Sequence, residues 1–69
     1  MNKYYTLYGC VGGKDFKINK QFKSRDKAIA YALMMLPLDA QVQEEIELKA
    51  NVIEYKCNQY NRFTVAKLA

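Results

Sequence analysis

The chain has 69 residues, of which 51% are hydrophobic and 26% are charged, a composition typical of one globular domain that argues against a disordered chain. Its net charge is +4, and its two cysteines and lack of histidine exclude a disulfide framework, a four-ligand zinc site and histidine-based catalysis. The longest apolar run, residues 28–36, is much shorter than the about 20 residues that span a bilayer, so we expect a soluble, cytoplasmic protein without membrane contact.

Residues 3–11 and 15–23 are predicted to form a β-hairpin. The first run is rich in aromatic and β-branched residues, and the second alternates between apolar and polar residues. Gly12-Gly13 between them is a strong signal for a two-residue turn, because both glycines can adopt positive φ.

A two-residue turn predicts the pairing of this hairpin. Leu7 would lie opposite Ile18, and Gly9 opposite Phe16. The core face would then carry five apolar residues: Tyr5, Leu7, Val11, Phe16 and Ile18. A four-residue loop would preserve the same faces.

Residues 25–36 are predicted to form a helix. Ser24 is a favourable N-cap, and Pro37 ends the helix because the residue before a proline is pushed out of the α region. Four apolar residues at helical spacing should face the sheet: Ile29, Ala32, Leu33 and Leu36.

Residues 38–50 are compatible with two structures. As a helix, they would carry an apolar stripe of Leu38, Val42 and Ile46, and Asp39 could cap it. As a strand, they would alternate between apolar and polar residues, with Glu44 as the one violation. Both alternatives stay open.

Residues 52–57 and 63–68 are predicted to form a second hairpin, with its turn in 58–62. Their apolar residues share one face only if the loop has an odd number of residues. The residues concerned are Ile53, Tyr55, Cys57, Phe63 and Val65. This favours a three-residue loop with Asn61 in the left-handed conformation, or a five-residue loop.

The predicted fold class is therefore α+β: an antiparallel sheet of two β-hairpins with one helix packed on it. The element order is ββα-x-ββ, where x is the ambiguous segment 38–50, and residues 1–69 form a single domain. A domain of this size buries only about 60% of the surface that its unfolded chain exposes, so self-association is an open route to extra stability.

The residue inventory predicts a non-enzymatic protein without cofactor or metal. Cys10 and Cys57 fall on or beside predicted strands, where cysteine is usually a small buried hydrophobe. The acidic residues between Asp39 and Glu47 lack the spacing and the glycine of a calcium loop. Gly12-Gly13 lacks the longer glycine pattern of a phosphate-binding loop.

The predicted helix is apolar on all sides from Ala28 to Leu36, so something must cover its outer side. Residues 38–50 could fold back over it; otherwise another chain covers it, and an identical subunit is the default partner. The leading hypothesis is an interaction module that forms a homodimer or homo-oligomer, or docks another protein partner, through Tyr31, Met34 and Met35.

Charge is distributed unevenly along the chain. Residues 14–27 hold six cations and two anions, a net charge of +4, whereas 39–47 carry four anions. Tyrosines among lysines on the outer face of the first hairpin could stack on bases and neutralise phosphates, although such pairs also stabilise an ordinary solvated sheet. The alternative hypothesis is a nucleic-acid-binding module that uses Tyr4, Tyr8, Lys17, Lys20 and Lys23. A protein inhibitor of a host enzyme would also fit the charge asymmetry.

The segment 22–28, followed by Tyr31, is similar to the strand-to-helix junction in the small arm-binding domains of phage integrases. Those domains use a three-stranded sheet on DNA, and the resemblance covers only this junction and the preceding hairpin. This chain departs from the family in having two predicted strands before the helix, and no residue roles are carried over.

Overall fold

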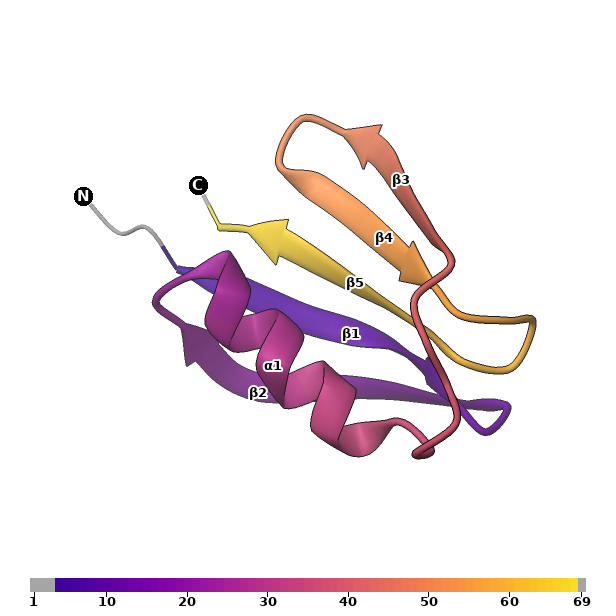
Figure 1. Cartoon of the computed structure of the whole chain (residues 1–69). Helices are drawn as coiled ribbons and strands as arrows, with labels where there is room; N and C mark the ends of the chain where they lie inside the picture. Colours follow the sequence, from indigo (N-terminus) through magenta and orange to yellow (C-terminus); the bar gives the residue numbers. More distant parts are fainter. Residues whose placement is uncertain (1–3, 69) are drawn as a thin grey trace.

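The computed structural model describes residues 4–68. Within them the chain forms one helix and five strands: β1 (Tyr5–Val11), β2 (Lys14–Phe22), α1 (Arg25–Met35), β3 (Glu44–Lys49), β4 (Val52–Lys56) and β5 (Arg62–Lys67). The strands make one antiparallel sheet in the order β2-β1-β5-β4-β3, and α1 covers one of its faces (Figure 1). The predicted α+β class, with one helix on an antiparallel sheet, is confirmed.

The first hairpin forms as predicted. Gly12 and Gly13 have φ of 61° and 82°, the positive values that a two-residue turn of this kind requires. Leu7 pairs with Ile18, and Gly9 pairs with Phe16. The register then shifts between Leu7 and Tyr5, where β2 spans two residues more than β1, and Phe22 stays on the same face as Phe16 and Ile18.

The ambiguous segment 38–50 contains a strand and no helix. Its second half is β3, which pairs with β4 at one edge of the sheet. Because an edge strand is open to solvent, the adjacent residues Glu44 and Glu45 are both exposed, which accounts for the interrupted alternation. Ahead of β3, Ala40 and Val42 pack against the core from the connection that follows α1.

The second hairpin has the five-residue loop that was one of the two predicted forms. Residues 57–61 connect β4 and β5, and Tyr55 pairs with Phe63 on the core face. The alternative with a left-handed Asn61 is wrong: the non-glycine residue with positive φ among those described is Asn51, at 65°, in the turn between β3 and β4. Asn58 shapes the loop instead, since its Oδ1 accepts hydrogen bonds from the backbone N–H groups of Tyr60 and Asn61 at 2.8 and 3.0 Å.

Helix α1 is capped as predicted and is rotated slightly from the predicted orientation. The Ser24 hydroxyl accepts a hydrogen bond from the backbone N–H of Lys27 at 3.2 Å. Ala32 and the C-cap residue Leu36 are buried and Ile29 packs against the core, as predicted, and Ala28 is buried with them. Leu33, which was expected to face the sheet, is 46% exposed, so that assignment is wrong. The helix thus packs on the sheet through the small side chains of Ala28 and Ala32, and Leu33 beside them points outward.

The core lies between α1 and the central strands. Leu7, Phe63 and Val65 are its largest fully buried side chains, and the Tyr55 and Phe63 rings stack with centroids 5.0 Å apart. Among the described strands, α1 contacts β1, β2 and β5 and does not contact β3 or β4. The β3–β4 hairpin therefore extends beyond the helix (Figure 1).

Gly9 allows the two central strands to approach closely. A Cβ at this position would lie 2.6 Å from the Cα of Phe63 and would also meet the backbone oxygen of Arg62. Real Cβ atoms do not approach other atoms this closely, so the pairing of β1 with β5 needs glycine here.

Candidate interaction surfaces

The outer side of α1 carries an exposed apolar surface, which we call the helix patch: Tyr31, Leu33, Met34 and Leu38. Met34 is 86% exposed and Leu38 is fully exposed, and both are large apolar side chains. Tyr31 and Met34 thus point outward as expected, whereas Met35 is half-buried at the flank. Sequence reasoning missed Leu33, which it assigned to the core, and Leu38, which it assigned to the ambiguous segment.

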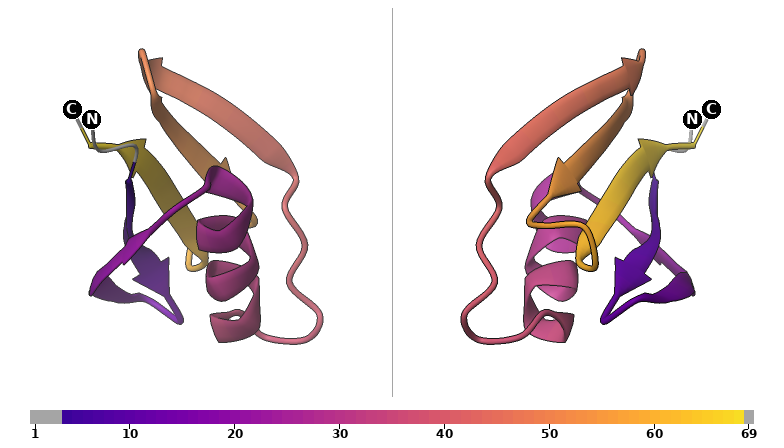
Figure 2. Two further views of the ribbon diagram at one scale, coloured as in Figure 1. Left: turned by 90° about the vertical axis from the view of Figure 1, so that its left-hand side faces the viewer. Right: turned by 90° about the vertical axis from the view of Figure 1, so that its right-hand side faces the viewer.

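An apolar hollow of about 490 Å³ lies beside the helix patch. It is enclosed by the end of α1 and the connection that follows it, and Leu36, Pro37 and Val42 contribute to its lining. Figure 2 shows this connection passing alongside α1 on its way to β3. The connection therefore covers a flank of the helix and leaves Met34 exposed.

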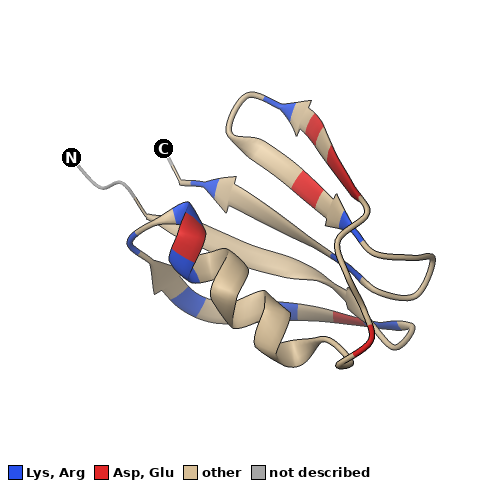
Figure 3. Cartoon of the chain, in the orientation of Figure 1, with Lys and Arg blue, Asp and Glu red and all other residues tan. Residues whose placement is uncertain are grey.

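Charges lie at the two ends of the helix patch. Lys23, Arg25 and Lys27 gather around the start of α1 with Asp26 among them, which leaves a net positive charge there, and the last turn of the helix has no basic residue. Asp39 follows just beyond the other end (Figure 3). The middle of the helix is uncharged, so the patch is an apolar stripe with a basic end and an acidic end.

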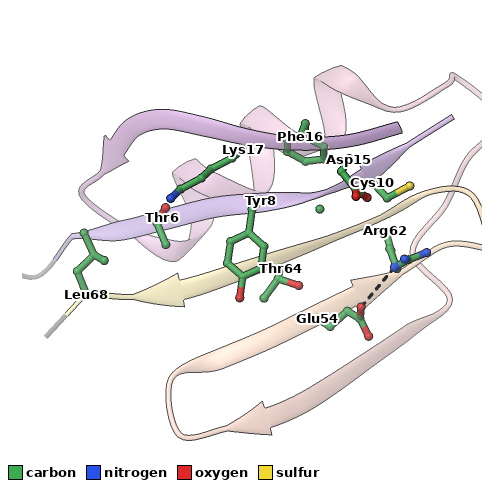
Figure 4. A pocket seen from close by; sticks show the side chains of 11 residues that line it. Thr6, Tyr8, Cys10, Asp15, Phe16, Lys17, Glu54, Arg62, Thr64 and Leu68 are labelled. Carbon is green, nitrogen blue, oxygen red and sulfur yellow. Dashed lines mark ion pairs between the residues drawn. The ribbon is translucent and has the colours of Figure 1, made fainter. Parts of the chain in front are cut away.

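The sheet face opposite α1, which we call the open face, carries a shallow hollow of about 640 Å³. Tyr8 lies directly between Lys17 of β2 and Thr64 of β5, and Figure 4 shows its ring over Thr64. Thr64 is buried. Two of the residues predicted to contact nucleic acid, Tyr8 and Lys17, are therefore brought together.

The charges of the open face balance one another. Arg62 forms an ion pair with Glu54 at 3.7 Å, drawn as the dashed line in Figure 4, and its Nη1 donates to the backbone oxygen of Gln59 at 3.0 Å. Asp15 and Lys17 both line the same hollow. A surface that binds phosphates carries an excess of cations, and this hollow has two cations and two anions.

Lys20 and Lys23, also predicted for this face, lie elsewhere. Lys20 lies on the helix side of β2, because alternation along the strand puts it on the same face as Ile18 and Phe22. Its Nζ is 5.6 Å from the ring centroid of Phe22 and 5.8 Å from that of Tyr31. Lys23 follows β2 in the loop that leads to α1. Tyr4 precedes β1 and is half-buried, and its backbone oxygen accepts from the N–H of Leu68 at 2.8 Å. The five residues therefore do not form one surface.

The two cysteines and the carboxylates are the side chains that could carry nucleophilic or metal chemistry. Cys10 is buried, Cys57 is half-buried, and burial raises the pKa of the Cys57 thiol, which makes it a weaker nucleophile at neutral pH. Residues 4–68 hold no group of three or more cysteines or carboxylates that could bind a metal ion. In the same range, no helix has the length and apolarity needed to cross a bilayer.

Comparisons with protein-family models, with curated proteins and with solved structures give no match to this chain.

Proposed function

We propose that the protein is a non-enzymatic interaction module that associates with a second copy of itself through the helix patch. The observation that carries this proposal is the exposure of Met34 and Leu38, two large apolar side chains that line an apolar hollow. Removing such side chains from water is favourable. A contiguous exposed apolar surface is more often an interaction site than other parts of a protein surface are.

The helix patch has the form that a two-fold contact needs. In a two-fold dimer the same surface is used twice, so it must contain both the projecting group and the recess that receives it. Here the strongly exposed Met34 and Leu38 line the hollow together with Leu36 and Val42, which are less exposed. Methionine suits this role because its unbranched side chain adapts to an irregular recess.

The charges favour antiparallel packing of the two helices. In that arrangement the basic start of one helix, with Lys23 and Lys27, lies next to Asp39 of the second copy. A parallel arrangement would bring the two basic ends together, and like charges in contact oppose association. The antiparallel two-fold dimer therefore buries the apolar stripe and pairs opposite charges at both ends.

Nucleic-acid binding is the alternative proposal, and it has less support. Tyr8 and Lys17 are adjacent on the open face, as that function would require. The same hollow contains Asp15 and Glu54, and Lys20 is on the other side of the sheet. Base stacking on Tyr8 would thus occur without a surrounding excess of positive charge.

The test is the mass of Met34→Glu in solution, measured by light scattering on a size-exclusion column in about 1 M salt, where exposed charges are screened within about 3 Å. We expect the unchanged protein to elute with the mass of two chains and Met34→Glu with the mass of one. Tyr60→Glu is the matched control, because Tyr60 is also a large exposed side chain but lies in the loop between β4 and β5, and this variant should remain a dimer. A single-chain mass for the unchanged protein, or a dimer for Met34→Glu, would overturn the proposal.

A second arm of the same experiment tests nucleic acid. We expect a short mixed-sequence DNA duplex to elute separately from the protein at low salt. Co-elution that disappears as salt rises, and that is lost in Tyr8→Ala, would favour the open face over the helix patch as the functional surface.

A further inference from the structure

The two edges of the sheet carry opposite charge. β2, at one edge, contains three lysines and one aspartate, and β3, at the other, contains three glutamates and one lysine. All of these charged residues are exposed. Among the described elements, β3 does not contact α1, whereas β2 borders the helix patch at Lys20, whose Nζ is 5.8 Å from the ring centroid of Tyr31.

The outward-facing backbone groups of β3 can be assigned from the neighbouring ladder. The backbone N–H of Lys67 donates to the oxygen of Asn51, and that of Cys57 donates to the oxygen of Asn61. Antiparallel strands alternate their hydrogen-bonded positions, so odd-numbered residues of β4 face β5 and even-numbered ones face β3. Through the pairs of β4 with β3, the N–H and C=O groups of Glu45 and Glu47 then point away from the sheet.

The same reasoning applies to β2. The two-residue turn makes Val11 and Lys14 the first hydrogen-bonded pair of the hairpin, and the alternate residues Phe16 and Ile18 also bond to β1. The backbone groups of Lys17 therefore point outward, where an additional strand can accept and donate hydrogen bonds.

β2 and β3 run in the same direction, because four antiparallel steps separate them in the order β2-β1-β5-β4-β3. A second copy displaced within the plane of the sheet would therefore bring its β3 beside β2 as a parallel neighbour. The sheet would continue across the contact with the helices of both copies on the same side.

We propose that β2 of one copy pairs in parallel with β3 of a second copy, with Lys17 opposite Glu44. In a parallel pair of strands, a residue that hydrogen-bonds across the contact lies opposite a residue whose own backbone groups point away from the contact. Lys17 points its backbone groups out of β2 toward the second copy, and Glu44 points its groups toward β4 of its own chain, so the two can lie opposite each other. Their side chains both lie on the open face. Lys20 follows Lys17 by three residues, and Glu47 follows Glu44 by three. The same register therefore places Lys20 opposite Glu47, and both side chains lie on the helix side.

Two copies could also pair through β2 with β2 or through β3 with β3, and the charges oppose both of these contacts. Pairing β2 with β2 would oppose lysines, and pairing β3 with β3 would oppose glutamates. Charged edge strands deter indiscriminate pairing in this way. The remaining combination uses two different surfaces, so it does not close as a two-fold dimer and instead generates open chains of subunits.

Two proline variants test the contact, both in the Met34→Glu background so that the helix patch does not contribute. Lys17→Pro removes an outward N–H from β2, and Glu45→Pro removes one from β3, while both leave the bonds within the monomer intact. At low salt we expect the parent to show a mass that rises with concentration and each proline variant to have the mass of one chain. An equimolar mixture of the two should form a pair, since one supplies a free β2 and the other a free β3.

Charge-reversal variants test the register without altering the backbone. Lys17→Glu and Glu44→Lys should each weaken association about tenfold, and the double variant should recover it, because the pair is restored with its signs exchanged. A parent that keeps the mass of one chain at every concentration in low salt would overturn the proposal, as would a double variant no better than the single ones. Either result leaves the outcome of the helix-patch experiment in about 1 M salt unaffected.

Discussion

The side-chain oxygen Oδ1 of Asn61 accepts a hydrogen bond from the backbone N–H of Gly12 at 2.9 Å. Alongside it, the N–H of Gly13 donates to the backbone oxygen of Tyr60 at 3.1 Å. These bonds join the turn of the first hairpin to the loop of the second. Asn61 is buried at this junction, and its Nδ2 donates to Oδ1 of Asn58 at 3.3 Å, which fixes the orientation of the amide.

We expect Asn61→Ala to lower the free energy of unfolding by about 1–2 kcal/mol, because it removes the acceptor for the Gly12 N–H in a partly buried site. The measurement is the midpoint of denaturant unfolding. Gln59→Ala is the matched control in the same loop, since that side chain is exposed, and it should change stability by less than about 0.5 kcal/mol. Equal effects of the two substitutions would contradict this account of the loop.

Gly9→Ala should destabilise the protein by about 2–3 kcal/mol, since the added Cβ meets the backbone of Phe63 and neither strand can yield without disturbing the central ladder. The thermal midpoint should fall accordingly.

Gly12→Ala is the comparison for this substitution. A Cβ at Gly12 meets no atom within 4 Å, so its cost comes only from the positive φ of 61° and should be about 1 kcal/mol. If Gly12→Ala destabilised the protein more than Gly9→Ala does, the close approach of the strands at Gly9 would not explain the loss of stability in Gly9→Ala.

Stability should decrease at alkaline pH. Burial raises the pKa of the Tyr55 hydroxyl above its ordinary value of 10.0 and that of the Cys57 thiol above 9.0. The folded state therefore holds these protons more tightly than the unfolded chain does. Their contribution to stability is fully present below about pH 9 and is lost as the pH rises through the folded-state pKa values.

The free energy of unfolding, measured from about pH 8 to about pH 11, should decrease with pH. In Tyr55→Phe this decrease should be smaller above pH 10, because the variant has no hydroxyl to ionise. Tyr60→Phe serves as the control, because Tyr60 is exposed and its substitution should leave the pH dependence unchanged. If the free energy of unfolding of Tyr55→Phe decreased with pH as much as that of the unchanged protein, groups other than Tyr55 would cause the decrease.

Local features of the fold could be predicted because short stretches of sequence determine them. Gly12-Gly13 specified the turn, Ser24 the helix start and Pro37 its end. The rotation of α1 could not be predicted, because apolar residues surround the helix and the spacing alone does not distinguish a face of Ala28 and Ala32 from one that includes Leu33. Packing against the sheet selects the face with the smaller side chains.

The candidate surfaces were partly predictable for similar reasons. Met34 and Tyr31 were identified because a helix on one sheet should be polar on its outer side, and this one is not. Lys20 was misplaced because it was grouped with Lys17 by charge, although strict alternation puts it on the face of Ile18 and Phe22, where the structure has it. The role of Asn61 depends on contact with Gly12, which is remote in sequence and leaves no local signal.

The pairing of β1 with β5 has a consequence for how fast the protein folds. These strands lie side by side at the centre of the sheet, yet β1 is the first and β5 the last of the five strands in sequence order. Central pairs such as Leu7 with Val65 therefore join residues that are far apart in sequence, and a long loop must close before they form. Contacts of this kind slow folding, so we expect a rate closer to that of all-β domains than to that of helical bundles.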